Sequence, residues 1–135
     1  METASPIFTL FVIEDNRTES MLLQLALSEI KNLSIKAFST ARELLQHLPE
    51  RPDIILVDLI LPDMSGIDLI KKIRAFDPKI RIVVVSAQRD MDLLAEVQSM
   101  GVFNYLVKSE SCLTYLHQVI SELVVLLQYY RSRSN

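Results

Sequence analysis

Short apolar runs alternate with segments of helical periodicity along almost the whole of this 135-residue chain. Five runs have the length and composition of β-strands, and they are residues 7–13, 33–38, 53–57, 80–85 and 103–107. Apolar residues recur at three- and four-residue spacing in five other segments, which are residues 17–30, 41–48, 67–73, 91–100 and 112–130. Strands and helices that alternate in this way predict a parallel α/β sheet with helices on both faces.

The five predicted strands differ in composition, and the difference predicts their order in the sheet. Residues 10–13, 54–57 and 82–85 are continuous apolar runs, as expected of strands that are buried on both faces. Residues 33–38 alternate apolar and polar side chains, and Asn104 interrupts the fifth run, so these two strands resemble edges. We therefore predict the flavodoxin-like order 2-1-3-4-5, joined by right-handed crossovers.

Composition argues against several classes of protein. Lys and Arg number 14 against 17 Asp and Glu, and the resulting net charge of −3 argues against direct binding of nucleic acid. The single cysteine, Cys112, cannot form an internal disulfide, which favours a reducing compartment and a cytoplasmic protein. The apolar stretches are too short for a membrane span. We expect one domain, residues 7–130, with an N-terminal extension (1–6) and a C-terminal tail (131–135).

Chemically active side chains stand where the predicted strands end. In chain order these residues are Glu14, Asp15, Asp58, Ser86 and Lys108. Strand order 2-1-3-4-5 brings them to one edge, where ligands bind in folds of this kind. Closely packed carboxylates repel each other unless a cation joins them, and oxygen ligands around an open site suit Mg²⁺. A carboxylate beside Mg²⁺ can accept a phosphoryl group, whose oxygens an amine and a hydroxyl can then neutralise and orient.

Most of these residues have an ordinary structural explanation when each is taken alone. Asp15 and Ser86 could cap the helices that follow them, and Lys108 could be a solvated surface residue. Asp58 is different because it ends an otherwise apolar run. Convergence at one edge favours the functional interpretation, whereas Asp53, at the opposite end of the same strand, is interpreted as structural.

Several motifs follow one another at characteristic spacings. They are Glu14-Asp15, Val57-Asp58-Leu59, Pro62, Gly66, Ser86-Ala87 and Tyr105-Leu106-Val107-Lys108. Pro62 and Gly66 stand four and eight residues after Asp58, and Lys108 stands 22 residues after Ser86. In this order and spacing the motifs resemble the receiver domain of two-component response regulators, over residues 7 to about 127.

The resemblance implies a phosphorylation site with a metal. Asp58 would be the phosphoacceptor and would form an aspartyl phosphate. Asp15 and Asp58 would bind Mg²⁺, Glu14 would help through a water molecule, and the backbone carbonyl of Ile60 would complete the metal site.

The resemblance also implies a switch and a set of partners. Lys108 and Ser86 would contact the phosphoryl group, and Ser86 and Tyr105 would form the switch, the Tyr105 ring moving into space that Ser86 vacates. The chain would then be a signalling switch rather than an enzyme, taking its phosphoryl group from a sensor histidine kinase or phosphotransfer protein. The face made by the fourth helix, fifth strand and fifth helix would change on phosphorylation, and could form a weak homodimer.

Three alternatives remain open at this point, and the sequence departs from the family at one position. An aspartyl-nucleophile phosphatase would need an acid two residues after Asp58, where Ile60 stands. A phosphorylation-independent interaction module and the excised receiver of a longer transcriptional regulator also fit the chain. Ser109 replaces the proline that follows the lysine in the family, so we expect a trans Lys108–Ser109 bond and a locally shifted loop.

Overall fold

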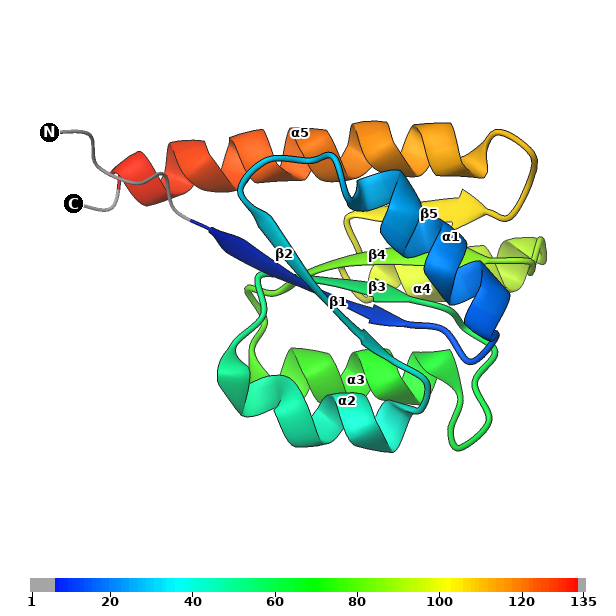
Figure 1. The fold of residues 1–135 in the computed structure, drawn as a ribbon. Coiled ribbons are helices and arrows are strands. Elements are labelled where there is room, and N and C mark those ends of the chain that lie inside the picture. The colour runs from blue at the N-terminus through cyan, green and yellow to red at the C-terminus, as the bar shows by residue number, and fades with distance from the viewer. Residues whose placement is uncertain (1–6, 134–135) are drawn as a thin grey trace, which may run out of the picture.

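A computed structural model describes residues 7–133, and within them five strands form one parallel sheet (Figure 1). The strands are β1 Phe8–Ile13, β2 Leu33–Phe38, β3 Ile54–Val57, β4 Arg81–Ser86 and β5 Asn104–Val107. Their order is β2-β1-β3-β4-β5, and each neighbouring pair runs parallel. The predicted flavodoxin-like order is therefore confirmed.

The pairing register brings the carboxyl ends of the central strands to one edge. Ile13 pairs with Val57, Val57 pairs with Val84, and Ser86 pairs with Val107. Because all the strands run in the same direction, the residues that follow β1, β3 and β5 leave the sheet at the same edge. This register is what allows residues almost a hundred positions apart to form one site.

Helices cover both faces of the sheet, as the alternating pattern predicts. The helices are α1 Arg17–Leu27, α2 Ala41–His47, the 3-10 helix η1 Leu48–Glu50, α3 Gly66–Phe76, α4 Met91–Ser99 and α5 Cys112–Arg133. Figure 1 shows α1 and α5 above the sheet and α2 and α3 below it. Helix α4 packs on the same side as α2 and α3, because Val97 belongs to their core cluster.

Alternate side chains of the central strands enter two separate cores. Phe11 and Ile13 of β1 belong to the core under α2, α3 and α4, whereas Leu10 and Val12 belong to the core under α1 and α5. Every residue of β3 is buried, while β2 alternates partly buried and exposed positions over its first four residues and has only Phe38 buried. The predicted distinction between central and edge strands is thus confirmed.

Three helix ends are capped by local side chains or by a glycine. The Glu43 N–H donates to Thr40 Oγ1 at 3.2 Å, and the Asp68 N–H donates to Ser65 Oγ at 3.1 Å. Gly101 follows α4 with a φ of 76°, the left-handed conformation that favours glycine after a helix. These caps define the beginnings of α2 and α3 and the end of α4.

The ends of other helices differ from the predicted ones. Helix α1 stops at Leu27 rather than residue 30, and there the Ser28 hydroxyl donates to the Leu25 carbonyl oxygen at 2.8 Å. Helix α5 runs on to Arg133, so residues 131–133 of the predicted tail are helical. The Arg131 guanidinium lies 4.3 Å from the centre of the Phe8 ring, a contact that favours this extension.

The predicted N-terminal extension, residues 1–6, lies outside the described residues, as do residues 134–135. Among the helices of residues 7–133, none combines the length and hydrophobicity that crossing a bilayer requires.

Candidate functional site

The two acidic residues that follow β1 differ sharply in burial. The Glu14 side chain is buried and accepts hydrogen bonds from the Asn16 N–H at 3.2 Å and from Lys108 Nζ at 2.8 Å. Asp15 is exposed. Neighbouring side chains of an extended chain point to opposite sides, so the inward position of Glu14 leaves Asp15 facing outward.

Asp58 follows β3 directly, and its carboxylate is buried with both oxygens engaged. Oδ1 accepts a hydrogen bond from the Ile60 N–H at 3.0 Å, and Oδ2 accepts one from Lys108 Nζ at 2.9 Å. The Asp58 N–H continues the sheet by donating to the Ile13 carbonyl oxygen at 3.2 Å. The carboxylate is therefore held by backbone on one side and by an ammonium group on the other.

Lys108 follows β5 and stands between three carboxylates. Its Nζ lies 2.8 Å from Glu14, 2.7 Å from Glu19 and 2.9 Å from Asp58. Glu19 comes from the first turn of α1, which begins at this same edge of the sheet. One ammonium group thus joins acids that come from β1, β3 and α1.

The electrostatic balance of this cluster shows in two pKa values. Burial raises the pKa of Glu14 to about 7, against the opposing effect of its hydrogen bond from Lys108. Burial acts to lower the pKa of Lys108, but its hydrogen bonds to Glu14, Glu19 and Asp58 outweigh burial and hold that pKa above its ordinary value. The lysine is charged, and three acids compete for its charge.

Ser86 and Tyr105 lie on the neighbouring strands β4 and β5. Ser86 is fully buried, and its Oγ accepts a hydrogen bond from the Gln88 N–H at 3.2 Å. The Tyr105 ring is also buried, and its hydroxyl donates to the Gln88 carbonyl oxygen at 2.9 Å. Burial raises the pKa of Tyr105, while a hydrogen bond with Ser86 acts in the opposite direction. Both residues therefore fasten the loop that leads into α4.

The buried position of Tyr105 bears on the predicted switch. The sequence-based expectation has the ring entering space that Ser86 vacates on phosphorylation. In this structure the ring already lies in the core cluster that includes Val97 of α4. The Tyr105 ring is therefore already buried before Ser86 moves. A movement of Ser86 would first alter the hydrogen bonds that Ser86 and Tyr105 make with Gln88.

The loop between Asp58 and α3 is held by a close backbone approach. The Gly66 N–H donates to the Leu59 carbonyl oxygen at 3.0 Å, and a Cβ at position 66 would lie only 2.5 Å from Leu59 Cα. Asp63, in the same loop, accepts hydrogen bonds from the N–H groups of Ala41 and Arg42 at 2.9 and 2.8 Å. The loop is thus tied to both α3 and α2.

Three carboxylates could hold a cation. Glu14, Glu19 and Asp58 each offer an oxygen, and these oxygens lie within 4.8 Å of one another. An all-oxygen donor set of this kind fits Mg²⁺, which binds through a few carboxylates and keeps several water molecules. The buried acidic cluster therefore fits both Mg²⁺ and an aspartyl phosphate.

The structure brings some predicted site residues into contact and leaves others apart. Glu14, Asp58 and Lys108 form one hydrogen-bonded group. Asp15 is outside it, and the Ile60 side chain is exposed while its N–H contacts Asp58, so the metal roles of both remain predictions. Sequence reasoning missed Glu19, because an acid in the first turn of a helix is ordinary there. The available signal was its helix, which begins at the edge where the other acids converge.

The bond after the lysine has the predicted geometry. No cis peptide bond occurs in the described part of the chain, so the Lys108–Ser109 bond is trans, as expected without a proline.

Comparison with known proteins matches this site to a family. The sequence profile described as "Response regulator receiver domain" matches residues 10–120. The DNA-binding transcriptional regulator NtrC of Proteus hauseri is 30% identical over 99 residues, which are 73% of this chain and 21% of that protein. Sporulation initiation phosphotransferase F of Bacillus subtilis is 32% identical over 59 residues, 44% of this chain and 48% of that protein. The chain thus spans about a fifth of NtrC and about half of the phosphotransferase.

Solved structures show the same fold. The isolated REC domain of RcsB from Salmonella enterica serovar Typhimurium, in the presence of phosphomimetic BeF3⁻, superposes with a TM-score of 0.80 at 20% identity, over 87% of this chain and 88% of that one. The phosphorylated cyanobacterial phytochrome response regulator RcpA has a TM-score of 0.73 at 26% identity, over 87% of this chain and 91% of that one.

Proposed function

This chain belongs to the response regulator receiver family, and on that premise we propose that it is a phosphorylation-activated switch of a two-component system. It takes a phosphoryl group from a histidine kinase or phosphotransfer protein onto Asp58, with Mg²⁺. The observation that carries the proposal is the buried Asp58 carboxylate, 2.9 Å from Lys108 and in one cluster with Glu14. Its place of action is the cytoplasm, where the lone Cys112 thiol stays reduced.

The chemistry proposed for Asp58 is nucleophilic. One carboxylate oxygen bonds to phosphorus while the P–N bond of a phosphohistidine breaks, and the leaving imidazole nitrogen keeps the bonding electron pair. The Ile60 N–H, 3.0 Å from Asp58 Oδ1, orients the carboxylate for this attack. Lys108 supplies positive charge to the phosphoryl oxygens.

The residues assigned to the metal are Glu14, Asp58, Asp15 and the backbone carbonyl of Ile60. When bound, Mg²⁺ would neutralise charge on the phosphoryl oxygens. Glu14 and Asp58 already belong to the acidic cluster, whereas Asp15 is exposed and would turn inward or act through water.

The proposed output depends on Ser86 and Tyr105. A phosphoryl group on Asp58 offers the Ser86 hydroxyl a charged acceptor, and movement of Ser86 toward it stretches the hydrogen bond that Ser86 Oγ now accepts from the Gln88 N–H. Tyr105 is bonded to the carbonyl of the same Gln88 and follows the change. The loop before α4 is therefore the first element to move.

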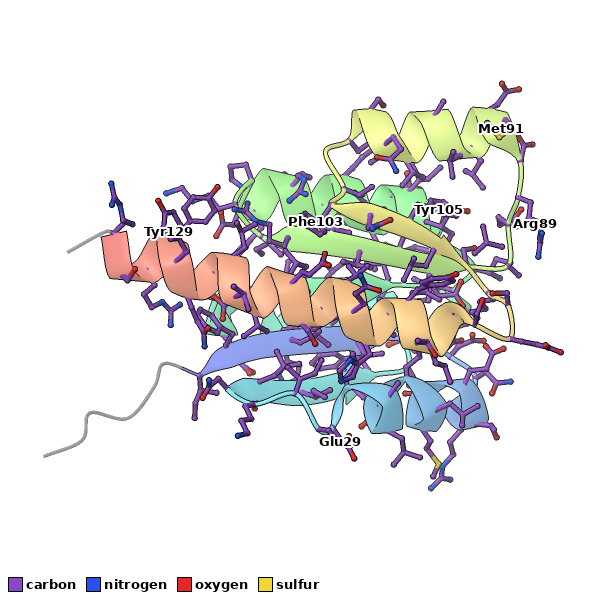
Figure 2. The ribbon with its side chains drawn as sticks, turned by 90° about the horizontal axis from the view of Figure 1, so that it is seen from above. Glu29, Arg89, Met91, Phe103, Tyr105 and Tyr129 are labelled. Carbon is purple, nitrogen blue, oxygen red and sulfur yellow. The ribbon has the colours of Figure 1, made fainter. Side chains whose placement is uncertain are left out.

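A weak symmetric homodimer through α4, β5 and α5 is a further part of the proposal. Exposed apolar side chains lie along this side of the molecule, including Met91, Phe103 and Tyr129 (Figure 2). Two apolar residues of α5, Cys112 and Val119, are instead buried in the chain's own fold. Light scattering across protein concentrations should show association that strengthens when BeF3⁻ and Mg²⁺ are added. An unchanged monomer under both conditions would remove this part of the proposal.

The alternative form of this proposal is that the chain is the receiver of a longer transcriptional regulator, since the matched region is about a fifth of NtrC. A DNA-binding output would then reside outside the 135 residues, which agrees with their net charge of −3.

The decisive experiment is labelling by a small phosphodonor. Acetyl phosphate with Mg²⁺ should add one acid-labile phosphoryl group per chain, detected by mass spectrometry. Chelating Mg²⁺ should prevent the addition, because the acidic cluster then repels the incoming anion. A chain that stays unmodified under saturating donor and Mg²⁺ would instead be a phosphorylation-independent interaction module.

A further inference from the structure

Every N–H donor of the Lys108 ammonium group has a carboxylate acceptor. An ammonium group carries three N–H donors, and Nζ lies within 2.9 Å of an oxygen of Glu14, Glu19 and Asp58. A phosphoryl oxygen that pairs with Lys108 must therefore replace one of these acceptors.

The three carboxylates differ in how readily each could be replaced. The Glu14 side chain is 1% exposed, so it would lose its partner in a buried environment, whereas the Asp58 side chain, 6% exposed, keeps one unesterified oxygen beside Lys108 after phosphorylation. The Glu19 side chain is 45% exposed, and water can solvate it when it leaves. Glu19 also borders a cavity of about 180 Å³ between α1 and α5, which gives the side chain room to turn.

We propose that Glu19 is a positioning residue that holds Lys108 before phosphorylation and exchanges its place with a phosphoryl oxygen afterwards. The inference rests on the proposed function of Asp58 and adds a residue to it. In the free chain Glu19 keeps the ammonium charge inside the acidic cluster. On phosphorylation the same contact opposes the incoming group, because Glu19 and the phosphoryl oxygens compete for one donor and repel each other.

The backbone fixes Glu19 at this point. Its N–H donates to Asn16 Oδ1 at 2.9 Å, the capping bond that begins α1. This bond holds the first turn of α1 in place, and the Glu19 side chain extends from that turn to Lys108. Release requires rotation of the Glu19 side chain alone.

The test compares E19Q with E29Q, which removes the same charge far from the site. Glu29 is exposed and lies beyond the end of α1 (Figure 2). With saturating Mg²⁺, we expect E19Q to bind BeF3⁻ about three- to fivefold more tightly than wild type, the effect of a partly exposed ion pair. The KM for acetyl phosphate should fall by a similar factor with a smaller change in kcat, and E29Q should match wild type.

A double-mutant cycle separates a contact with Lys108 from simple charge repulsion. If Glu19 acts through Lys108, the labelling rate at low acetyl phosphate should be nearly the same in K108A and in the E19Q/K108A double variant. An equal gain from E19Q in both backgrounds would overturn the positioning role. Weaker BeF3⁻ binding by E19Q would also overturn it, since Glu19 would then assist the site.

The two proposals fail in different ways. Wild-type chain that neither binds BeF3⁻ nor takes an acid-labile phosphoryl group contradicts the proposed function itself. Wild-type chain that does both, with E19Q indistinguishable from E29Q, leaves the function standing and removes only the role of Glu19.

Discussion

Strand β3 carries a carboxylate at each end, and the two have very different surroundings. At the amino edge, Asp53 accepts the Thr9 N–H at 2.9 Å and pairs with Arg131 at 3.4 Å. At the carboxyl edge, Asp58 shares the single Lys108 with Glu14 and Glu19. The first end has one acid and one cation of its own, whereas the second has an excess of acids.

The contrast shows what separates a structural acid from a functional one in this fold. A satisfied carboxylate such as Asp53 ties two strands to α5 and has no need of a ligand. The acidic excess around Asp58 leaves unbalanced negative charge in a buried place, which a divalent cation can neutralise. We therefore expect the functional site at the carboxyl edge, where the negative charge around Asp58 is not fully compensated.

The largest difference between the two edges is expected when Asp58 and Asp53 are neutralised one at a time. We expect D58N to lose all labelling by acetyl phosphate, because Asp58 is the proposed nucleophile among the three carboxylates around Lys108, with its Oδ1 oriented by the Ile60 N–H. D53N should keep full labelling, since its amide oxygen can still accept the Thr9 N–H, and should lower the free energy of unfolding by about 1 kcal/mol or less. Mass spectrometry and urea denaturation measure the two effects. Labelling that survives in D58N would move the phosphoacceptor elsewhere.

The next largest difference between the two edges is expected when the basic residue at each edge, Lys108 or Arg131, is replaced by alanine. K108A leaves three carboxylates without their shared partner, and we expect a loss of about 2–3 kcal/mol in the free energy of unfolding without Mg²⁺. Adding Mg²⁺ should recover much of that loss, because a divalent cation can replace the lysine charge. R131A removes a half-exposed partner and should cost about 1 kcal/mol, with no Mg²⁺ dependence.

The contradictory result would be equal Mg²⁺ responses in the two variants, measured by thermal unfolding with and without the ion. The acidic excess at the carboxyl edge would then not be what binds the cation.

Periodicity and strand composition were enough to predict the sheet order, because the central strands β1, β3 and β4 each contain a continuous run of four apolar residues. The convergence of Glu14, Asp58 and Lys108 followed from that order alone. The directions of the individual side chains could not be predicted from that order. Glu14 rather than Asp15 turns inward, and Glu19 reaches the lysine from a helix. Both depend on side-chain directions at the point where β1 ends and α1 begins, which local sequence does not encode.

A smaller difference is expected between alanine substitutions at the two glycines, Gly66 and Gly101. In G66A the new Cβ meets Leu59 Cα at 2.5 Å, so the backbone beside Asp58 must shift. We expect a loss of about 1–2 kcal/mol together with slower labelling. G101A strains a residue with φ of 76° and costs about 1 kcal/mol, but its new Cβ meets only the Arg74 side chain at 3.8 Å.

Labelling rates distinguish the two variants even if their stabilities are similar. Slow labelling in G66A with normal labelling in G101A would show that the Asp58 loop, rather than overall stability, governs the rate. The same rate in both would contradict that conclusion.

The smallest expected effect concerns Asp63. This residue lies at the carboxyl edge, yet like Asp53 its carboxylate accepts hydrogen bonds from backbone N–H groups. Hydrogen bonds from the N–H groups of Arg42 and Ala41 hold the pKa of Asp63 below its ordinary value. A lowered pKa in the folded chain stabilises it above the unfolded value near 4. That stabilisation is lost as the pH falls through the pKa of Asp63 in the folded chain.

We therefore expect D63N to be slightly less stable than wild type at pH 7, with a difference that shrinks below about pH 4. Labelling at pH 7 should be unchanged, because the Asp63 carboxylate contacts α2 and not Lys108. Thermal unfolding of both proteins between pH 3 and 7 measures the difference. A gap that stays constant over that range would mean that the charge of Asp63 is not what caps α2, and impaired labelling would place Asp63 with the functional acids instead.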